Sequence, residues 1–195
     1  DKDGEKHISL LSDRLLHMPI SAEIEVRKEV AYMGEIAQKM LSRIEQLFDS
    51  PSEKLLNKIR DHEKMLDNTD NEIHTFLLKL LGKSTLNSAD IASLININTY
   101  YENLGDNLKD LGKAIIKGNE KKTLFNEIQK KDILQMLHNN KEFIDYLSTL
   151  ILNNYSINKE KTYEEAMEKY HQIKGFYYEA RQRHYDNVDK SLIPA

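Results

Sequence analysis

Apolar residues recur every three or four positions along most of the chain, which is the period of one helix face. The first such run follows Pro19, with Ser21 as a suitable N-cap, and the sequence Asp49-Ser50-Pro51 breaks it. Its apolar positions are Val26, Val30, Met33, Ala37, Met40, Ile44 and Leu47. This spacing predicts a long helix that buries one face in a helical bundle.

Two more long runs follow the same pattern. One ends near Leu81 and Gly82, and the next begins after Ser88, a suitable cap, and ends at Gly118. The second run carries Leu55, Ile59, Leu66, Ile73 and Leu77, and the third carries Leu94, Ile97, Tyr101, Leu104, Leu108, Leu111 and Ile115. Each helix would be roughly 45 Å long. Three long helices of this kind predict one three-helix unit.

The rest of the chain repeats two thirds of this unit. A fourth run carries Ile133, Leu137, Ile144, Leu147 and Ile151, and a fifth carries Ala166, Tyr170, Ile173, Tyr177, Ala180, His184 and Val188. The polar residues 153–158 separate the two runs. We therefore expect an all-α protein with an extended lead-in (1–20), a complete three-helix repeat (21–118) and a partial second repeat (119–195).

The fifth run is unusually aromatic. It contains Tyr163, Tyr170, Phe176, Tyr177, Tyr178 and Tyr185, which cover more of a helix than one buried face requires. A helix without its neighbour would expose this apolar surface, so we expect a homodimer through the second-repeat helices or pairing with another chain.

Composition excludes several classes of protein. Cysteine is absent, which removes disulfides and thiolate metal ligands. The net charge is −4, and the scattered basic residues form no patch, which argues against nucleic-acid binding. No run approaches the roughly 18–20 apolar residues that a membrane span needs. We expect this chain to be soluble by itself and to be part of a longer protein.

Two acidic ladders are the strongest candidate for a binding site. They consist of Glu63, Asp67 and Asp70 in the second predicted helix and of Glu102, Asp106 and Asp110 in the third. Because residues four apart share a helix face, two such helices side by side would form a strip of carboxylates suited to metal ions. Like charges at this spacing repel each other, and a cation would relieve the repulsion. The alternative is a solvated helix face.

Other signals are weaker. Gly105 precedes Asp106 in the middle of a predicted helix, where glycine costs up to about 1 kcal/mol, and a close approach of another backbone or a ligand would explain it. Glu168 and His171 form one E-x-x-H, whereas di-iron bundles need two. His184 fits an anion ligand less well than a packed bundle histidine. We find no glycine-rich phosphate loop and no G-x-S-x-G motif.

Together the ladders resemble the PhoU family. Residues 63–73 are similar to its acidic E-x-x-x-D ladder ending in E-I, and residues 101–110 are similar to its E-R-I-G-D-x-x-x-N motif. Asn103 and Leu104 replace the usual Arg-Ile, and Asp110 stands at the usual Asn. The resemblance covers residues 22–118 and continues more weakly to the fifth helix.

The flanking segments narrow this resemblance. Residues 11–19 and 173–184 look like parts of the C-terminal PhoU-like domain of bacterial sodium/phosphate cotransporters. The resemblance implies a non-enzymatic regulatory domain at the cytoplasmic face of the bacterial inner membrane, whose partner is the transmembrane portion of a phosphate transporter. It also implies metal ions such as iron, zinc or magnesium. The implied ligands are Glu63, Asp67, Glu102, Asp106 and Asp110, with Asp70 peripheral.

Three alternatives stay open at this point. The first is a free-standing PhoU-like regulator of an ABC-type phosphate importer. The second is a carboxylate-bridged metalloenzyme of the helical-bundle type. The third is a purely structural helical module, in which neutral variants of the ladders would keep every activity.

Overall fold

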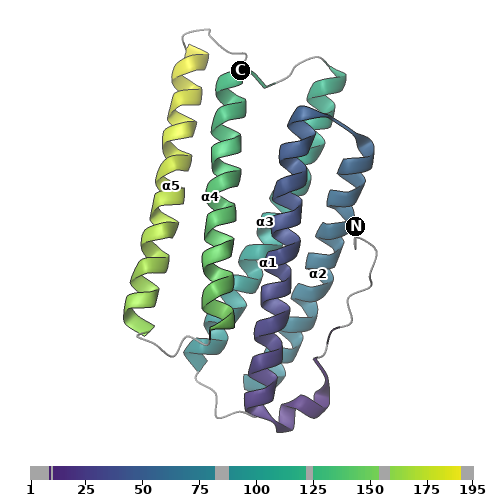
Figure 1. The fold of residues 1–195 in the computed structure, drawn as a ribbon, viewed down its shortest axis with the longest axis vertical. Coiled ribbons are helices and arrows are strands. Elements are labelled where there is room, and N and C mark those ends of the chain that lie inside the picture. The colour runs from purple at the N-terminus through teal and green to yellow at the C-terminus, as the bar shows by residue number, and fades with distance from the viewer. Residues whose placement is uncertain (1–8, 10, 82–87, 122–124, 154–158, 190–195) are drawn as a thin grey trace.

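The structure is a computed structural model of a bundle of long helices (Figure 1). It describes residues 9, 11–81, 88–121, 125–153 and 159–189. The elements in these ranges are the 3-10 helix η1 (Asp13–His17) and the α-helices α1 (Pro19–Asp49), α2 (Glu53–Leu81), α3 (Ser88–Glu120), α4 (Glu127–Leu152) and α5 (Lys159–Asp189). No strand occurs in the described ranges, so the all-α prediction is confirmed.

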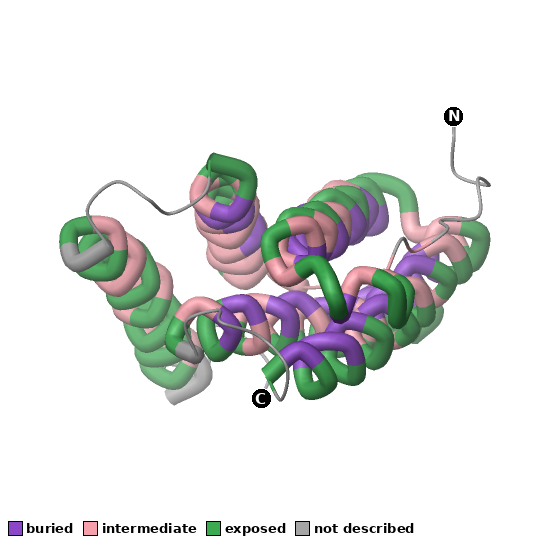
Figure 2. Tube along the Cα trace, turned by 90° about the horizontal axis from the view of Figure 1, so that it is seen from below, coloured by how far each residue is buried: buried purple, intermediate pink, exposed green. Residues whose placement is uncertain are grey.

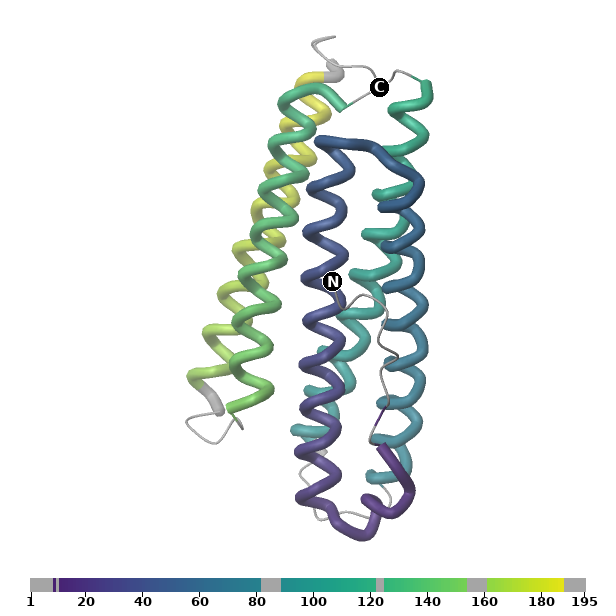
Figure 3. Tube along the Cα trace, turned by 45° about the vertical axis from the view of Figure 1, so that its right-hand side comes forward, coloured from purple at the N-terminus to yellow at the C-terminus, as the bar shows by residue number. Residues whose placement is uncertain are grey.

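Helix α1 lies at the centre of the bundle. It packs against α2 and α3 on one side and against α4 on the other, while α2 and α3 pack against each other. Helix α5 packs against α4, on the side of the molecule far from α2 (Figure 3). The fold is therefore a three-helix group with a two-helix pair attached through α1 and α4.

The predicted apolar face of α1 is confirmed residue by residue. All seven predicted positions, from Val26 to Leu47, are fully buried. Neighbouring helices on both sides also bury Ile36 and Leu41. Burial of each large aliphatic side chain contributes about 1.5–3 kcal/mol, so α1 anchors the core.

Helix α5 buries only part of its predicted apolar face and exposes its tyrosines, as expected of a helix that lacks a further neighbour. Tyr170 and Tyr177 are 44% and 47% exposed, and the side chain of Val188 lies outside the described residues. Ala180 is buried, and Ile173 and Phe176 are half-buried. In Figure 2, α5 at the left is mostly exposed, whereas buried segments concentrate in the helices around α1. The helix buries a narrower face because α4 is its main neighbour.

Several predicted boundaries differ from the observed ones. Helix α1 begins at Pro19 rather than after Ser21, because proline fits the first turn of a helix and Met18 takes the N-cap position. Within the expected extended lead-in, residues 13–17 form η1. Helix α3 continues past Gly118 to its last residue, Glu120. The side chain of Ser88 lies outside the described residues, so its predicted capping is untested.

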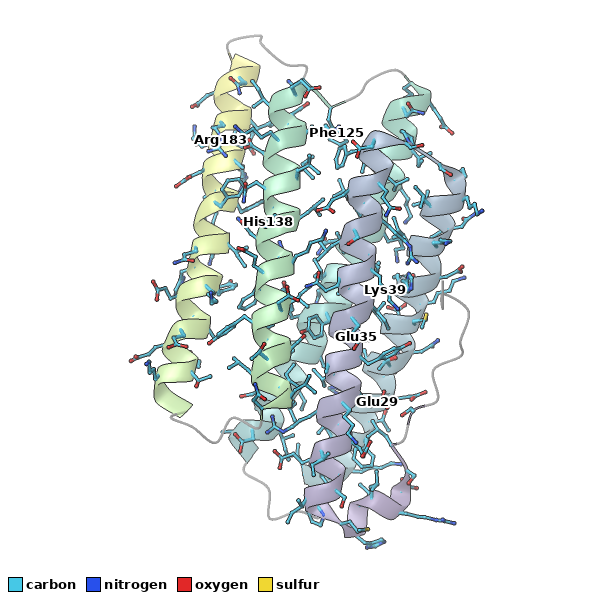
Figure 4. All side chains as sticks on the ribbon, viewed as in Figure 1. Glu29, Glu35, Lys39, Phe125, His138 and Arg183 are labelled. Carbon is cyan, nitrogen blue, oxygen red and sulfur yellow. The ribbon has the colours of Figure 1, made fainter. Side chains whose placement is uncertain are left out.

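A capping box and an aromatic pair fix the start of α4. The Asn126 side chain accepts a hydrogen bond from the Gln129 backbone, the Gln129 side chain accepts one from the Asn126 backbone, and both measure 2.9 Å. Beside this cap, Phe125 meets Phe48 of α1 edge-on, with ring centres 5.6 Å apart (Figure 4). The two contacts orient α4 along α1.

No helix in the described ranges is both long enough and apolar enough to cross a membrane. The division into a complete and a partial three-helix repeat stays a prediction.

Candidate functional site

The two acidic ladders lie on the paired helices α2 and α3. Gly105 explains how closely these helices approach, because a Cβ atom there would lie 2.6 Å from Cδ1 of Leu66. Leu66 is fully buried at this crossing. The close neighbour of Gly105 is therefore a side chain of α2, rather than the backbone or ligand that the sequence suggested.

The crossing brings five of the six ladder carboxylates together. We call Glu63, Asp67, Asp70, Glu102 and Asp106 the acidic strip. Burial raises the pKa of Glu102 above its ordinary value, and the charges of Asp106, Asp70, Asp67 and Glu63 raise it further. Burial also raises the pKa of Asp67, with Glu63 and Asp106 adding to it and Lys109 opposing. The strip is one electrostatically coupled group.

Lys109 supplies the positive charge of the strip. Its ammonium donates a hydrogen bond of 2.7 Å to Asp106 and another to Glu63, which is 7% exposed. These two bonds raise the pKa of Lys109 above its ordinary value. The expected repulsion is therefore relieved, at least in part, by a cation of the protein itself, which the sequence reasoning overlooked.

Asp70 lies at the end of the strip and is held by Asn98 of α3. The Asn98 amide donates a hydrogen bond of 2.6 Å to Asp70 Oδ1, and Asn98 is fully buried. Burial raises the pKa of Asp70, and the nearby His74 opposes this shift. Asn98 Oδ1 has no hydrogen-bond partner in the described part of the chain. Asn98 lies four residues before Glu102 and therefore shares its helix face, and this spacing could have identified Asn98 as a member of the site from the sequence.

Asp110 does not join the strip. It accepts a hydrogen bond of 2.8 Å from Lys113, and its side chain is 73% exposed. This contact lowers the pKa of Asp110 below its ordinary value. The third carboxylate of the α3 ladder thus forms a solvent-exposed ion pair with Lys113.

The observed arrangement does not fit a metal ion. Over the described ranges, no three His, Asp or Glu side chains are placed so that they could hold one. Between Glu63 and Asp106 stands the ammonium of Lys109, whose own contacts satisfy both carboxylates. The ligand set implied by the resemblance gains no support from this arrangement and stays a prediction.

The acidic strip lies in the part of the chain that matches the model of a known domain family. Residues 30–115 match the family model of the PhoU domain. The match includes all six predicted site residues, Lys109 and Asn98, and it ends before α4. No curated protein and no solved structure matches the chain. A PhoU domain is a helical bundle, as observed here, and PhoU family members are regulators rather than enzymes. The match indicates a regulatory role connected with phosphate transport.

Proposed function

We propose that this chain is a non-enzymatic regulatory domain of a sodium-dependent phosphate transporter. It acts from the cytoplasmic face of the bacterial inner membrane on the transmembrane portion of the transporter. The observation that carries this proposal is the PhoU match over residues 30–115, with the acidic strip inside it. The two flanking resemblances, in residues 11–19 and 173–184, favour the sodium-coupled transporter over a free-standing regulator.

The acidic strip is the part of the domain best suited to respond to ions. Lys109 bonds to two of its five carboxylates, Glu63 and Asp106, and its charge also acts on Asp67, so the local charge is unbalanced in favour of the carboxylates. A change in cation concentration or in a neighbouring charged surface would act on such a group most strongly where it is partly buried.

Phosphate uptake tests the proposal. Sodium-driven uptake of radiolabelled phosphate is measured in cells that carry the full gene, with wild-type protein or with Glu102→Gln and Asp106→Asn. We expect the strip variant to change how uptake responds to external phosphate. A matched control, Glu168→Gln with Asp186→Asn, neutralises two exposed carboxylates of α5 and should behave as wild type. Uptake that is unchanged when residues 1–195 are deleted would refute the proposal.

Metal binding by the strip is a separate proposal, carried by the resemblance to the PhoU family. Elemental analysis of protein purified without chelator tests it, beside a variant with Asp67→Asn and Glu102→Gln. Stoichiometric iron, zinc or magnesium that is lost in the variant would support it and would require Lys109 to leave its present position. Metal-free protein that also takes up none of these ions would leave the strip as an internal ion-pair network.

Nothing in the described residues favours the metalloenzyme alternative. Glu168 and His171 are exposed on α5, away from the acidic strip on α2 and α3.

A further inference from the structure

Helix α5 presents a continuous aromatic surface to solvent. Its tyrosines at 163, 170, 177 and 185 are spaced by seven or eight residues, about two helical turns, and Tyr178 lies beside Tyr177. All five tyrosines are between 44% and 66% exposed. We call this surface the tyrosine stripe. It flanks the narrow face that packs against α4, where Ala180 is buried.

The charged side chains that the structure describes within the tyrosine stripe, Lys174 and Arg181, are positive. The Lys174 ammonium lies 5.8 Å from the centre of the Tyr170 ring and 6.0 Å from that of Tyr178. The Arg181 guanidinium lies 5.4 Å from the centre of the Tyr185 ring, and its Nε donates a 3.2 Å hydrogen bond to the Tyr185 hydroxyl. By helical spacing, the carboxylates of α5 whose side chains the structure describes project from the other exposed side, and they are Glu164, Glu165, Glu168, Glu179 and Asp186.

An apolar groove adjoins the stripe. It lies between α4 and α5 and has a volume of about 280 Å³. Apolar side chains that line it include Ile128, Ile133 and Met136 of α4 and Ala180 of α5. Tyr177 and Arg181 belong to both the groove and the stripe, so the two form one surface. Asp132 also lines the groove, where its carboxylate accepts a 2.8 Å hydrogen bond from Arg183 and is neutralised by it. The surface therefore offers a place for aliphatic side chains, with a positive, hydroxyl-rich rim next to it.

We propose that this surface docks an amphipathic helix with an acidic edge, supplied by another protein. Leucine-like side chains of that helix would fill the groove, and its carboxylates would accept hydrogen bonds from Lys174, Arg181 and the tyrosine hydroxyls. Tyrosine and arginine are the residue types that contribute most at such interfaces. The proposal goes beyond the regulatory role above and does not depend on its connection with phosphate.

Charge decides between this partner and two other occupants. A second copy, paired stripe to stripe, would bring the Lys174 and Arg181 side chains of both chains into one interface, and none of the described carboxylates of α5 lies within a stripe to offset them. An anionic lipid surface would attract these cations but would repel the row of carboxylates on the adjacent exposed side of α5. Of the three occupants, only an acidic helix has charges opposite to those of the stripe, and its binding leaves the carboxylates of α5 in water.

Binding of two designed peptides tests the proposal on the full chain. Both are amphipathic helices of roughly 21 residues with leucine on one face, and they differ only in having glutamate or lysine along the edge of that face. Their binding is followed by fluorescence anisotropy. We expect the glutamate peptide to bind at least about tenfold more tightly than the lysine peptide.

A charge reversal in the stripe sharpens the test. The variant Lys174→Glu with Arg181→Glu should reverse the preference, so that the lysine peptide binds more tightly. Its control, Lys131→Glu with Lys161→Glu, makes the same change in net charge at exposed positions outside the stripe and should bind the peptides as wild type does. Circular dichroism checks that both variants keep the helical fold.

Other outcomes would overturn the proposal. Equal binding of the two peptides, no binding of either, or a preference that survives the charge reversal would show that the stripe does not select an acidic helix. Sedimentation equilibrium that shows a dimer lost only in the stripe variant would assign the surface to a second copy. Stripe-dependent binding to phosphatidylglycerol vesicles, with neither peptide bound, would assign it to lipid.

Discussion

The α2–α3 pair and the α4–α5 pair are built from similar periodic sequences but differ in how they use their charged and aromatic residues. Helices α2 and α3 each pack against α1 as well as against each other, and this burial draws carboxylates and Lys109 into one network. Helix α5 has α4 as its main neighbour, so its tyrosines face solvent. The number of neighbouring helices, rather than the helical period, therefore decides whether a surface is buried within the protein or available to a partner.

Two lysines show the same contrast. Lys109 bonds to two carboxylates across the α2–α3 crossing, whereas Lys174 lies over tyrosine rings on the exposed side of α5. The first contact is satisfied within the protein. The second leaves the ammonium free to meet a carboxylate from outside.

The largest expected effect comes from removing the two lysines in turn. Lys109→Met leaves the buried Glu63 without its cation and should lower the free energy of unfolding by about 2 kcal/mol, less than for a fully buried pair because Lys109 is partly exposed. Lys174→Met removes an exposed cation and should change it by less than about 0.5 kcal/mol. Urea unfolding followed by circular dichroism measures both. An equal loss of unfolding free energy in the two variants would contradict the contrast between the α2–α3 pair and the α4–α5 pair.

Two glycines provide a matched test of packing. Gly105→Ala places a methyl group 2.6 Å from Leu66 Cδ1. Because Leu66 is fully buried and has little room to shift, the overlap should cost more than the helix propensity of alanine gains, and the protein should lose about 1 kcal/mol of stability. Gly175→Ala in α5 meets no atom within 4 Å and should stabilise the protein by up to about 1 kcal/mol, because alanine favours helix. Thermal unfolding of both variants gives the signs. A stabilising Gly105→Ala would contradict the close crossing of α2 and α3.

A smaller effect should appear as a pH dependence of stability at Glu102. Because the folded state raises the pKa of Glu102 above its ordinary value of 4.5, its contribution to stability is greatest below that pH and is lost as pH rises through the folded pKa. Glu102→Gln should therefore stabilise the protein by a few tenths of a kcal/mol at pH 7 and have no effect at pH 3. Glu168→Gln on the exposed side of α5 is the control and should be neutral at both pH values. Urea midpoints at the two pH values measure the difference, and an effect of Glu102→Gln that is the same at both would contradict the coupling.

Much of the fold could be predicted from the sequence, because helical period and breaking residues are local. The face of α1 from Val26 to Leu47 was predicted fully, since helices on both sides bury whatever apolar face α1 offers. Tyr170 and Tyr177 of α5 share the predicted apolar face but are exposed, as the excess of aromatic residues on this helix suggested, because the period shows which residues share a face but not whether a neighbour covers it.

The candidate site was predicted less completely. Five carboxylates do gather at the α2–α3 crossing, but Asp110 does not join them, although α3 still meets Leu56 of α2 at Gly112. Each step of four residues turns about 40° further around a helix, so the third ladder position faces solvent. Lys109 was visible three residues after Asp106, yet its bond to Glu63 depends on how α2 and α3 are aligned. Local spacing gave the ladders, and tertiary packing decided which of their members interact.

Amide hydrogen exchange of the wild-type chain, read by mass spectrometry, tests the contrast between the two pairs most directly. The account predicts that the amides of α2 and α3 at the acidic strip exchange only through global unfolding, while those of α5 exchange at least about tenfold faster through local opening. Uniform protection of α2, α3 and α5 in the isolated chain would contradict it, because α5 would then be as closed as the helices around α1.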